Sequence, residues 1–149
     1  MKPHEFQTYS DYFIVDYADE IAANFDHSLE KSRAIATAEL AEDLPQGVAT
    51  PEHHLLCIET TDNGTIGYLW YRLLDEGNSA FILDFYLFEN HRGQGNGKAT
   101  LAVLEAQLAQ QGVQELKLRV AFKNERARQL YEKVGFNITG YNMRKVLPT

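Results

Sequence analysis

The stretch Leu83–Thr100, LDFYLFENHRGQGNGKAT, decides how the rest of the chain is interpreted. An apolar run typical of a strand ends at Phe88, and a glycine-rich turn leads into a sequence typical of a helix. Gly93, Gly95 and Gly97 lack a Cβ, so the backbone can turn sharply and approach a bound molecule closely. A helix that begins there presents unpaired N–H groups and the positive end of its dipole. The stretch therefore predicts an anion site, most often one for phosphate.

Two common phosphate-binding loops do not fit this stretch. A P-loop requires GxxxxGK[ST]; Gly97 and Lys98 are present, but Arg92 stands at the first glycine and Ala99 at the Ser/Thr. A dinucleotide-binding loop requires GxGxxG, and here Lys98 occupies the third glycine position. Neither nucleotide motif is therefore complete.

The loop does match Arg92-x-x-Gly95-x-Gly97, which resembles the [QR]-x-x-G-x-[GA] motif of the GNAT superfamily of N-acetyltransferases. In that family the motif cradles the pyrophosphate of acetyl-CoA. A second stretch, Leu118–Phe136 (LRVAFKNERARQLYEKVGF), resembles the family's other hallmark: a strand, an Asn that opens a helix, a Leu-Tyr pair within it and a final Gly-Phe. The resemblance covers roughly residues 58–146.

The residues of the second stretch are consistent with that architecture. Asn124 is a favourable helix N-cap, and Gly135 suits the position after a helix end. The helix between them carries one apolar face at i, i+3, i+4 and i+7, made of Ala127, Leu130, Tyr131 and Val134. The segment 44–55, LPQGVATPEHHL, is similar to a subgroup of small bacterial GNAT proteins whose substrates are unassigned.

The resemblance implies an α/β (α+β) fold with a mixed, mostly antiparallel twisted central sheet flanked by about four helices. A length of 149 residues suits one domain over residues 1–149. Residue patterns predict helices at Phe13–Phe25, at Leu29–Leu44 after a Ser28 cap, and from the glycine loop to about Gln111. They predict strands at His54–Glu59, Thr65–Leu74 and Ser79–Phe88, and a closing hairpin of Phe136–Thr139 and Tyr141–Leu147.

Composition restricts the partners. The net charge is −7, which argues against non-specific nucleic-acid binding. Residues 1–90 carry 4 Lys+Arg and 17 Asp+Glu, and residues 91–149 carry 10 and 4, so a basic half suits an anionic cofactor and an acidic half suits an amine. No apolar run reaches the roughly 20 residues of a membrane span, and the polar start lacks a signal-peptide pattern. We therefore expect a cytoplasmic protein without membrane contact, in which the single cysteine, Cys57, is a buried hydrophobe.

The resemblance implies which residues hold the cofactor. The backbone amides of the loop would bind the pyrophosphate, with Arg92 and Lys98 adding positive charge; the loop residues are Gly93, Gln94, Gly95, Asn96, Gly97 and Lys98. The family's strand before the loop carries a bulge, and Leu87 corresponds to that position. Its amide would stabilise the negative charge on the thioester oxygen. Asn124 would contact the cofactor arm or a nearby water, in addition to or instead of capping its helix.

Two proton transfers complete the expected chemistry. Tyr131 matches the family's tyrosine that protonates the leaving thiolate, and a packing role on the apolar helix face is the alternative. The amine must lose a proton before attack, and Asp84 is the leading candidate base because burial in an apolar strand should raise its pKa. Other candidates are Glu89, Glu59, His53 and a chain of waters. No set of residues at metal-ligand spacing accompanies the histidines, so no metal is expected.

The sequence thus predicts an acyltransferase, specifically an N-acetyltransferase, that moves the acetyl group of acetyl-CoA directly to a primary amine. The acceptor would be a small molecule or a peptide or protein N-terminus. The alternative is a non-catalytic acyl-CoA-binding sensory module, against which the presence of both Asn124 and Tyr131 argues. Members of the family often pair as dimers, so a homodimer stays open.

Overall fold

The computed structural model describes residues 1–149, which divide into two units, Met1–Arg119 and Val120–Thr149. Each unit is described by itself, and the single domain expected over residues 1–149 stays a prediction. No helix combines the length and the hydropathy that a membrane-spanning segment needs.

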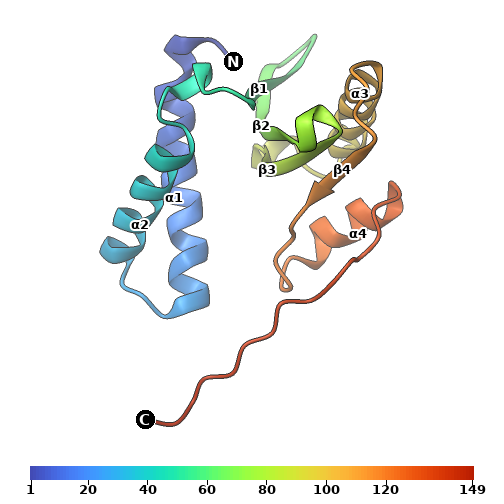
Figure 1. Ribbon diagram of the computed structural model, residues 1–149. Helices are drawn as coiled ribbons and strands as arrows, with labels where there is room; N and C mark the ends of the chain where they lie inside the picture. Colours follow the sequence, from blue (N-terminus) through green and yellow to red (C-terminus); the bar gives the residue numbers. More distant parts are fainter. The chain divides into compact units, whose positions relative to one another are not determined.

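The first unit is built on one four-stranded sheet in the order β1-β2-β3-β4 (Figure 1). β1, β2 and β3 pair antiparallel, whereas β4 lies parallel to β3. The strands are His53–Thr60, Gly64–Leu74, Ser79–Leu87 and Glu115–Leu118. A parallel pair requires a crossover connection, and here α3 supplies it over Asn96–Gln110. The predicted mixed, mostly antiparallel sheet is confirmed.

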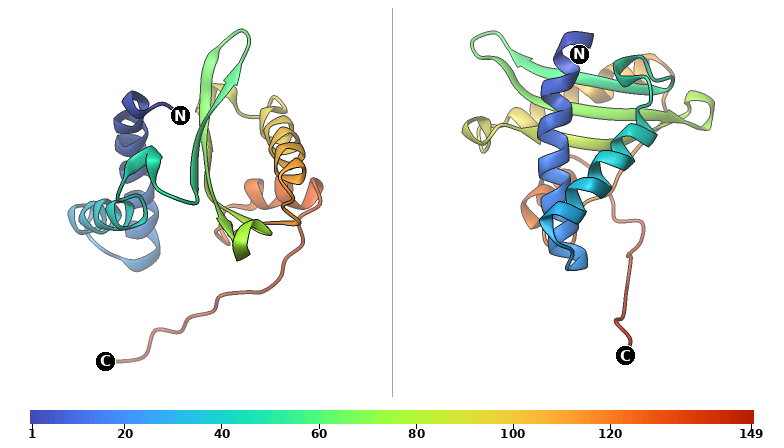
Figure 2. Two further views of the ribbon diagram at one scale, coloured as in Figure 1. Left: turned by 45° about the horizontal axis from the view of Figure 1, so that its top comes forward. Right: turned by 90° about the vertical axis from the view of Figure 1, so that its left-hand side faces the viewer.

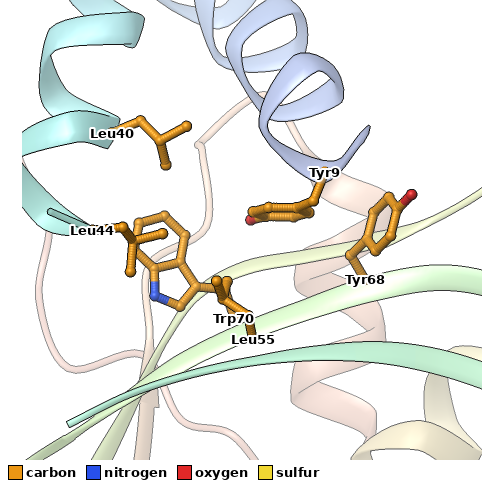
Figure 3. Close-up of a cluster of buried hydrophobic side chains, with 6 residues drawn as sticks. All are labelled: Tyr9, Leu40, Leu44, Leu55, Tyr68 and Trp70. Atoms are coloured by element: carbon orange, nitrogen blue, oxygen red, sulfur yellow. The ribbon is translucent and has the colours of Figure 1, made fainter. Parts of the chain in front are cut away.

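Helices cover both faces of this sheet. α1 (Phe6–Phe25) and α2 (Leu29–Asp43) lie on one face and α3 lies on the other (Figure 2). The core under α1 and α2 is largely aromatic, and Figure 3 shows the Tyr9 ring of α1 beside Tyr68. The buried members of this core are Tyr9, Leu40, Leu44, Leu55, Tyr68 and Trp70. Burial of these large side chains fixes α1 over β2.

The α1–α2 connection follows the predicted capping chemistry. The Ser28 Oγ accepts a hydrogen bond from the Lys31 N–H at 3.1 Å, which satisfies one unpaired donor of α2. α1 begins at Phe6 rather than at the predicted Phe13. A 3₁₀ turn, Pro3–Glu5, directly precedes it. The chain has three more such turns, at Gly47–Ala49, Asp75–Gly77 and Glu89–His91.

The second unit contains one helix, α4, over Glu125–Lys133. The Asn124 Oδ1 accepts from the Ala127 N–H at 3.2 Å, and Gly135 follows the helix with a φ of 107°, so the predicted cap and stop are confirmed. The predicted closing hairpin is wrong for this structure, because residues 137–149 form no strand. Their alternating apolar sequence has no ladder to pair with in this unit.

Candidate active site

A β-bulge in β3 creates the centre of the site. Trp70 faces Asp84 and Tyr71 faces Ile82, so Leu83 is the extra residue on β3. Side chains of a regular strand alternate between the two faces. Leu83 packs against the aromatic core, and yet the next residue, Asp84, also contacts α1. The bulge therefore turns the carboxyl toward α1, as bulges commonly re-aim a side chain.

Two tyrosines of α1 hold the Asp84 carboxyl. The Tyr9 hydroxyl donates to Oδ2 at 2.9 Å, and the Tyr12 hydroxyl lies 3.3 Å from both oxygens. Tyr9 is fully buried, whereas Tyr12 is half-buried. Burial and the neighbouring carboxyl raise the pKa of both phenols above their usual value. Both hydroxyls therefore stay protonated and act as donors.

The same surroundings tune the acidity of Asp84. Burial raises its pKa to about 7, and the hydrogen bonds from Tyr9 and Tyr12 oppose that rise. The negative charges of Asp16 and Glu20 add to it. At neutral pH this carboxyl is therefore poised between its protonated and ionised forms, which is the condition under which a general base works best.

A chain of aromatic contacts connects this carboxyl to the glycine loop. The Tyr12 and Tyr86 rings lie 4.2 Å apart between centroids. The Arg92 guanidinium lies 5.0 Å from the Tyr86 ring centre, in the position of a cation–π contact. α1 thus contacts Asp84 directly and is connected to Arg92, the residue that precedes the loop, through the Tyr86 ring.

Side chains of the loop brace its own backbone. The Gln94 amide group donates to the Asn90 carbonyl at 3.0 Å, and the Asn96 amide group donates to the His91 carbonyl at 3.0 Å. Both side chains are therefore used to fix the turn. The main-chain N–H groups are left to face any ligand.

The backbone amides of the loop form an open anion cradle. The N–H groups from Gly93 to Lys98 make no hydrogen bond within the protein, and the first bond of the helix runs from the Ala99 N–H to the Gly95 carbonyl at 3.0 Å. Gly93 and Gly95 have φ values of 71° and 83°, which favour glycine. A Cβ added at Gly95 would meet no atom within 4 Å. Open space thus lies in front of six unpaired donors at a helix N-terminus.

The register between β2 and β3 orients the main chain of Leu87. The Phe88 N–H donates to the Ile66 carbonyl at 2.8 Å, and the next pair along the ladder is Gly67 and Leu87. Opposed antiparallel pairs alternate between bonded and non-bonded. The Leu87 N–H therefore points away from β2. A glycine is needed opposite because a Cβ at Gly67 would lie 2.1 Å from the Tyr86 carbonyl.

The Leu87 amide points to the side of β3 on which β4 pairs, but beyond the last residue of β3 that is paired with β4. β4 pairs with β3 only from Ser79 to Ile82. The Leu87 carbonyl accepts from the Arg92 Nε at 2.7 Å, so only its N–H stays available to a ligand. The bulge expected at Leu87 lies instead at Leu83, where the β3–β4 pairing ends. β3 has no pairing with β4 beyond this point, and the role of the Leu87 amide stays a prediction.

Comparisons with known proteins match the chain along most of its length. The sequence profile of the Acetyltransferase (GNAT) family matches residues 9–136. The chain belongs to this family. It is 34% identical over 149 residues to YycN of Bacillus subtilis, named as an uncharacterized N-acetyltransferase, covering 99% of this chain and 96% of that protein. The crystal structure of YycN superposes with a TM-score of 0.92, covering 100% of this chain and 96% of that chain.

More distant GNAT relatives carry names that state an acceptor or a ligand. The [ribosomal protein bS18]-alanine N-acetyltransferase of Haemophilus influenzae is 40% identical over 77 residues, 51% of this chain and 50% of that protein. The PaiA N-acetyltransferase of Thermoplasma acidophilum, solved with coenzyme A, has a TM-score of 0.71 at 18% identity, covering 95% of this chain and 89% of that chain. The second likeness shows the shared GNAT fold alone.

The GNAT family uses acetyl-CoA, and the residues of this member fit it. A pyrophosphate requires several converging donors and a close approach to the backbone. The open amides of the loop and the bare Cα of Gly95 provide both. Arg92 does not extend freely into this space, because its Nε is engaged by the Leu87 carbonyl. Lys98 is exposed in the first turn of α3.

The two remaining site candidates lie in the second unit of this acetyltransferase. Asn124 is engaged as the cap of α4 through its Oδ1. Tyr131 is half-buried on α4, and its ring lies 5.6 Å from that of Phe136 in an edge-to-face contact. The packing interpretation of Tyr131 and the capping interpretation of Asn124 are therefore both supported by contacts, and the cap uses the Asn124 side-chain oxygen.

The other candidate bases in the GNAT domain are less favourably placed. The His53 Nδ1 accepts from the Trp70 Nε1 at 2.9 Å, and burial lowers the pKa of this imidazole. Glu59 and Glu89 are exposed. Cys57 is half-buried, and burial raises the pKa of its thiol, so it is a poor nucleophile. These surroundings favour Asp84.

Sequence reasoning missed the residues that complete this site. The predicted helix began at Phe13, so it left out Tyr9 and Tyr12 and contained Asp16. The three residues follow one another at i, i+3 and i+7. That spacing was a detectable signal of a single face. A catalytic role for this face could not be inferred from the sequence, because only the fold shows that α1 packs against Asp84.

Proposed function

The chain is an acetyltransferase of the GNAT family, and we propose that it transfers the acetyl group of acetyl-CoA directly to a primary amine, with Asp84 as the general base. The observation that carries the proposal is the Asp84 carboxyl, turned by a bulge and held by two tyrosine hydroxyls of α1. It lies on the strand that leads to the glycine loop. Acetyl-CoA, when bound, supplies the thioester acetyl group.

Binding of the co-substrate is assigned to the loop. The amides from Gly93 to Lys98 would receive the pyrophosphate, and the positive charges of Arg92 and Lys98 would add to the attraction. The Leu87 N–H would stabilise the negative charge that grows on the thioester oxygen, because it is fixed in direction and unpaired with β2.

Proton movement is assigned to two residues. The Asp84 carboxylate would take a proton from the acceptor ammonium, which frees the nitrogen lone pair for attack. The half-buried Tyr12 hydroxyl, in contact with the same carboxylate, would orient it. The Tyr131 hydroxyl would give a proton to the thiolate sulfur as the C–S bond breaks. Asn124 would contact the cofactor arm through the part of its amide that does not cap α4.

The acceptor is proposed from charge. The acidic residues Asp16 and Glu20 lie close enough to act on the pKa of Asp84, so the acceptor side of the site favours a cation. A protonated amine of a small molecule satisfies this, as does a peptide or protein N-terminus. The relative that acts on a ribosomal protein supports the second class. Cytoplasmic location and independence from metal stay predictions.

Acetyl-CoA calorimetry beside a thiol-release screen tests this function. The screen would cover polyamines, amino acids, aminoglycosides and short peptides. Binding with acceptor-dependent thiol release is the expected result. Binding with no release for any acceptor would favour the sensory module instead. Absence of binding would remove the cofactor site itself.

A further inference from the structure

The Arg92 side chain, just before the glycine loop, is held by three neighbours in the first unit. Its Nε donates to the Leu87 carbonyl at 2.7 Å, and its guanidinium carbon lies 5.0 Å from the centre of the Tyr86 ring. Partial burial and the charge of Asp19 raise the pKa of Asp16 on α1, and the nearby positive charge of Arg92 opposes that rise. Arg92 is therefore anchored to β3 and α1, and its Nε–H is not free for a phosphate.

Two of these contacts flank the peptide group that carries the Leu87 N–H. This group joins Tyr86 to Leu87, and Arg92 packs on the ring of the first residue and binds the carbonyl of the second. The Tyr86 ring also packs against Tyr12, at 4.2 Å between centroids. A peptide group is planar and turns only about the bonds at its two ends. Contacts to both flanking residues therefore restrict its rotation.

The bond from Arg92 lies on the side of β3 where no strand pairs with Leu87. In an extended strand, the N–H and C=O of one residue point to the same side, and β4 pairs with β3 only as far as Ile82. The next peptide group is held on the β2 side, where the Phe88 N–H donates to the Ile66 carbonyl at 2.8 Å. On the opposite side its carbonyl accepts from Arg92. Arg92 thus supplies the contact that a paired strand would otherwise supply.

We propose that Arg92 is a positioning residue that sets the direction of the Leu87 N–H toward the thioester oxygen. A donor lowers the barrier most when it is oriented before the charge develops. Arg92 acts through Leu87 and requires no contact with the thioester or the acceptor. Its main effect is on the rate of acetyl transfer, and its charge contributes less to acetyl-CoA affinity. This inference rests on the proposed function, which gives the Leu87 N–H its role.

Two substitutions separate positioning from charge. In Arg92→Gln the side-chain nitrogen is as many bonds from the Cα as the Nε of arginine, so it can donate to the Leu87 carbonyl without carrying a charge. In Arg92→Lys the charge stays, but the ammonium is one bond farther out and lacks the planar geometry of the guanidinium. Positioning predicts that Arg92→Gln transfers acetyl well and Arg92→Lys does not. A charge that attracts phosphate predicts the reverse order.

Single-turnover thiol release measures the rate, with saturating acetyl-CoA and an acceptor from the screen, and calorimetry measures the acetyl-CoA Kd. Arg92→Lys should lower the rate at least about tenfold and leave the Kd within about twofold. Arg92→Gln should keep the rate within about threefold and raise the Kd at most about fivefold, as the loss of one exposed charge would. Arg33→Lys, at an exposed arginine of α2, is the matched control and should change neither. Equal rates for the two Arg92 variants, or a slower rate for Arg92→Gln, would overturn the proposal.

The infrared spectrum of bound acetyl-CoA tests the Leu87 N–H itself and requires no acceptor. With an isotopic label in the acetyl carbonyl, a hydrogen bond from this N–H should lower the stretching frequency of the bound thioester relative to free acetyl-CoA. The lowering should persist in Arg92→Gln and be lost in Arg92→Lys. Equal lowering in all three proteins would overturn the positioning role and leave the proposed function standing. No lowering in the wild type would remove Leu87 from the proposed function, and this inference with it.

Discussion

The two units, Met1–Arg119 and Val120–Thr149, both carry expected catalytic residues, but they differ in how many of their side chains are buried. Every buried residue of the chain lies at or before Leu108, and none follows it. Asp84 sits in the first region under two tyrosine hydroxyls, whereas Tyr131 sits in the second on a helix without a buried residue. Catalytic groups require a supporting shell that locks their positions. The base therefore has that shell within the first unit, and the candidate acid packs on Phe136 within the second unit.

Removal of the proposed base, Asp84 in the first unit, should have the largest effect on activity. Asp84→Asn keeps the size of the side chain and its contact with Tyr9 but removes proton acceptance, so kcat/KM should fall about 10²–10⁴-fold. Steady-state thiol release over a range of acceptor concentrations, with acetyl-CoA saturating, measures this. The control Glu89→Gln neutralises an exposed carboxylate near the loop, and it should leave the rate within threefold. If Glu89→Gln is the damaging change, the two carboxylates have been assigned the wrong way round.

The open loop should respond next. Gly95→Arg forces a side chain into a left-handed position and into the space in front of the loop amides, so acetyl-CoA affinity should fall about 100-fold by calorimetry. Gly112 provides a matched control because it also has a positive φ, 86°, and open space around its Cα, at the far end of α3. Gly112→Arg carries similar strain and should bind normally. Equal losses for both variants would mean that strain, not phosphate contact, decides the result.

A change at Tyr131, in the second unit, should have a smaller effect, which is confined to kcat. Tyr131→Phe removes the proposed proton donor but keeps the ring that packs on Phe136, so kcat should fall about 10- to 100-fold. The acetyl-CoA dissociation constant should stay within twofold. Unchanged turnover would assign Tyr131 to packing alone.

The last expected effect concerns stability rather than turnover. In the folded state the pKa of Asp84 is raised from 3.8 to about 7, so the folded protein binds its proton more tightly than the unfolded chain does. This stabilisation is complete below pH 4 and is lost as the pH rises through 7. Asp84→Asn never ionises, and it should be more stable than the wild type by about 4 kcal/mol at pH 8, with a difference near zero at pH 4. Urea unfolding at both pH values measures it, and a pH-independent difference would contradict the raised pKa.

Local sequence signals were sufficient for several features of both units. The glycine loop, the Ser28 cap and the Asn124 cap were predictable because each is encoded within a few residues. The apolar neighbours of Asp84 were enough to anticipate its raised pKa. These features depend on short-range geometry, which the residue types determine.

Features that depend on long-range packing were not predictable in the same way. The contacts of Tyr9 and Tyr12 with Asp84 join residues more than seventy positions apart, 75 and 72 respectively. The bulge at Leu83 arises from the register between β2 and β3, which no residue of β3 announces by itself. Residues 137–149 have a sequence typical of a strand, but a stable strand requires a paired neighbour. The sequence alone does not show which strand that neighbour would be.

The pH dependence of kcat/KM in Tyr9→Phe tests the central claim most directly. The hydrogen bond from Tyr9 lowers the pKa of Asp84, so its removal should move the acid limb of the profile from about pH 7 to higher pH. Tyr17→Phe is the matched control, because Tyr17 lies on the same helix and donates to Glu39 instead. The account predicts a shifted limb in Tyr9→Phe and an unmoved limb in Tyr17→Phe. Identical profiles for the wild type and both variants would contradict Asp84 as the base.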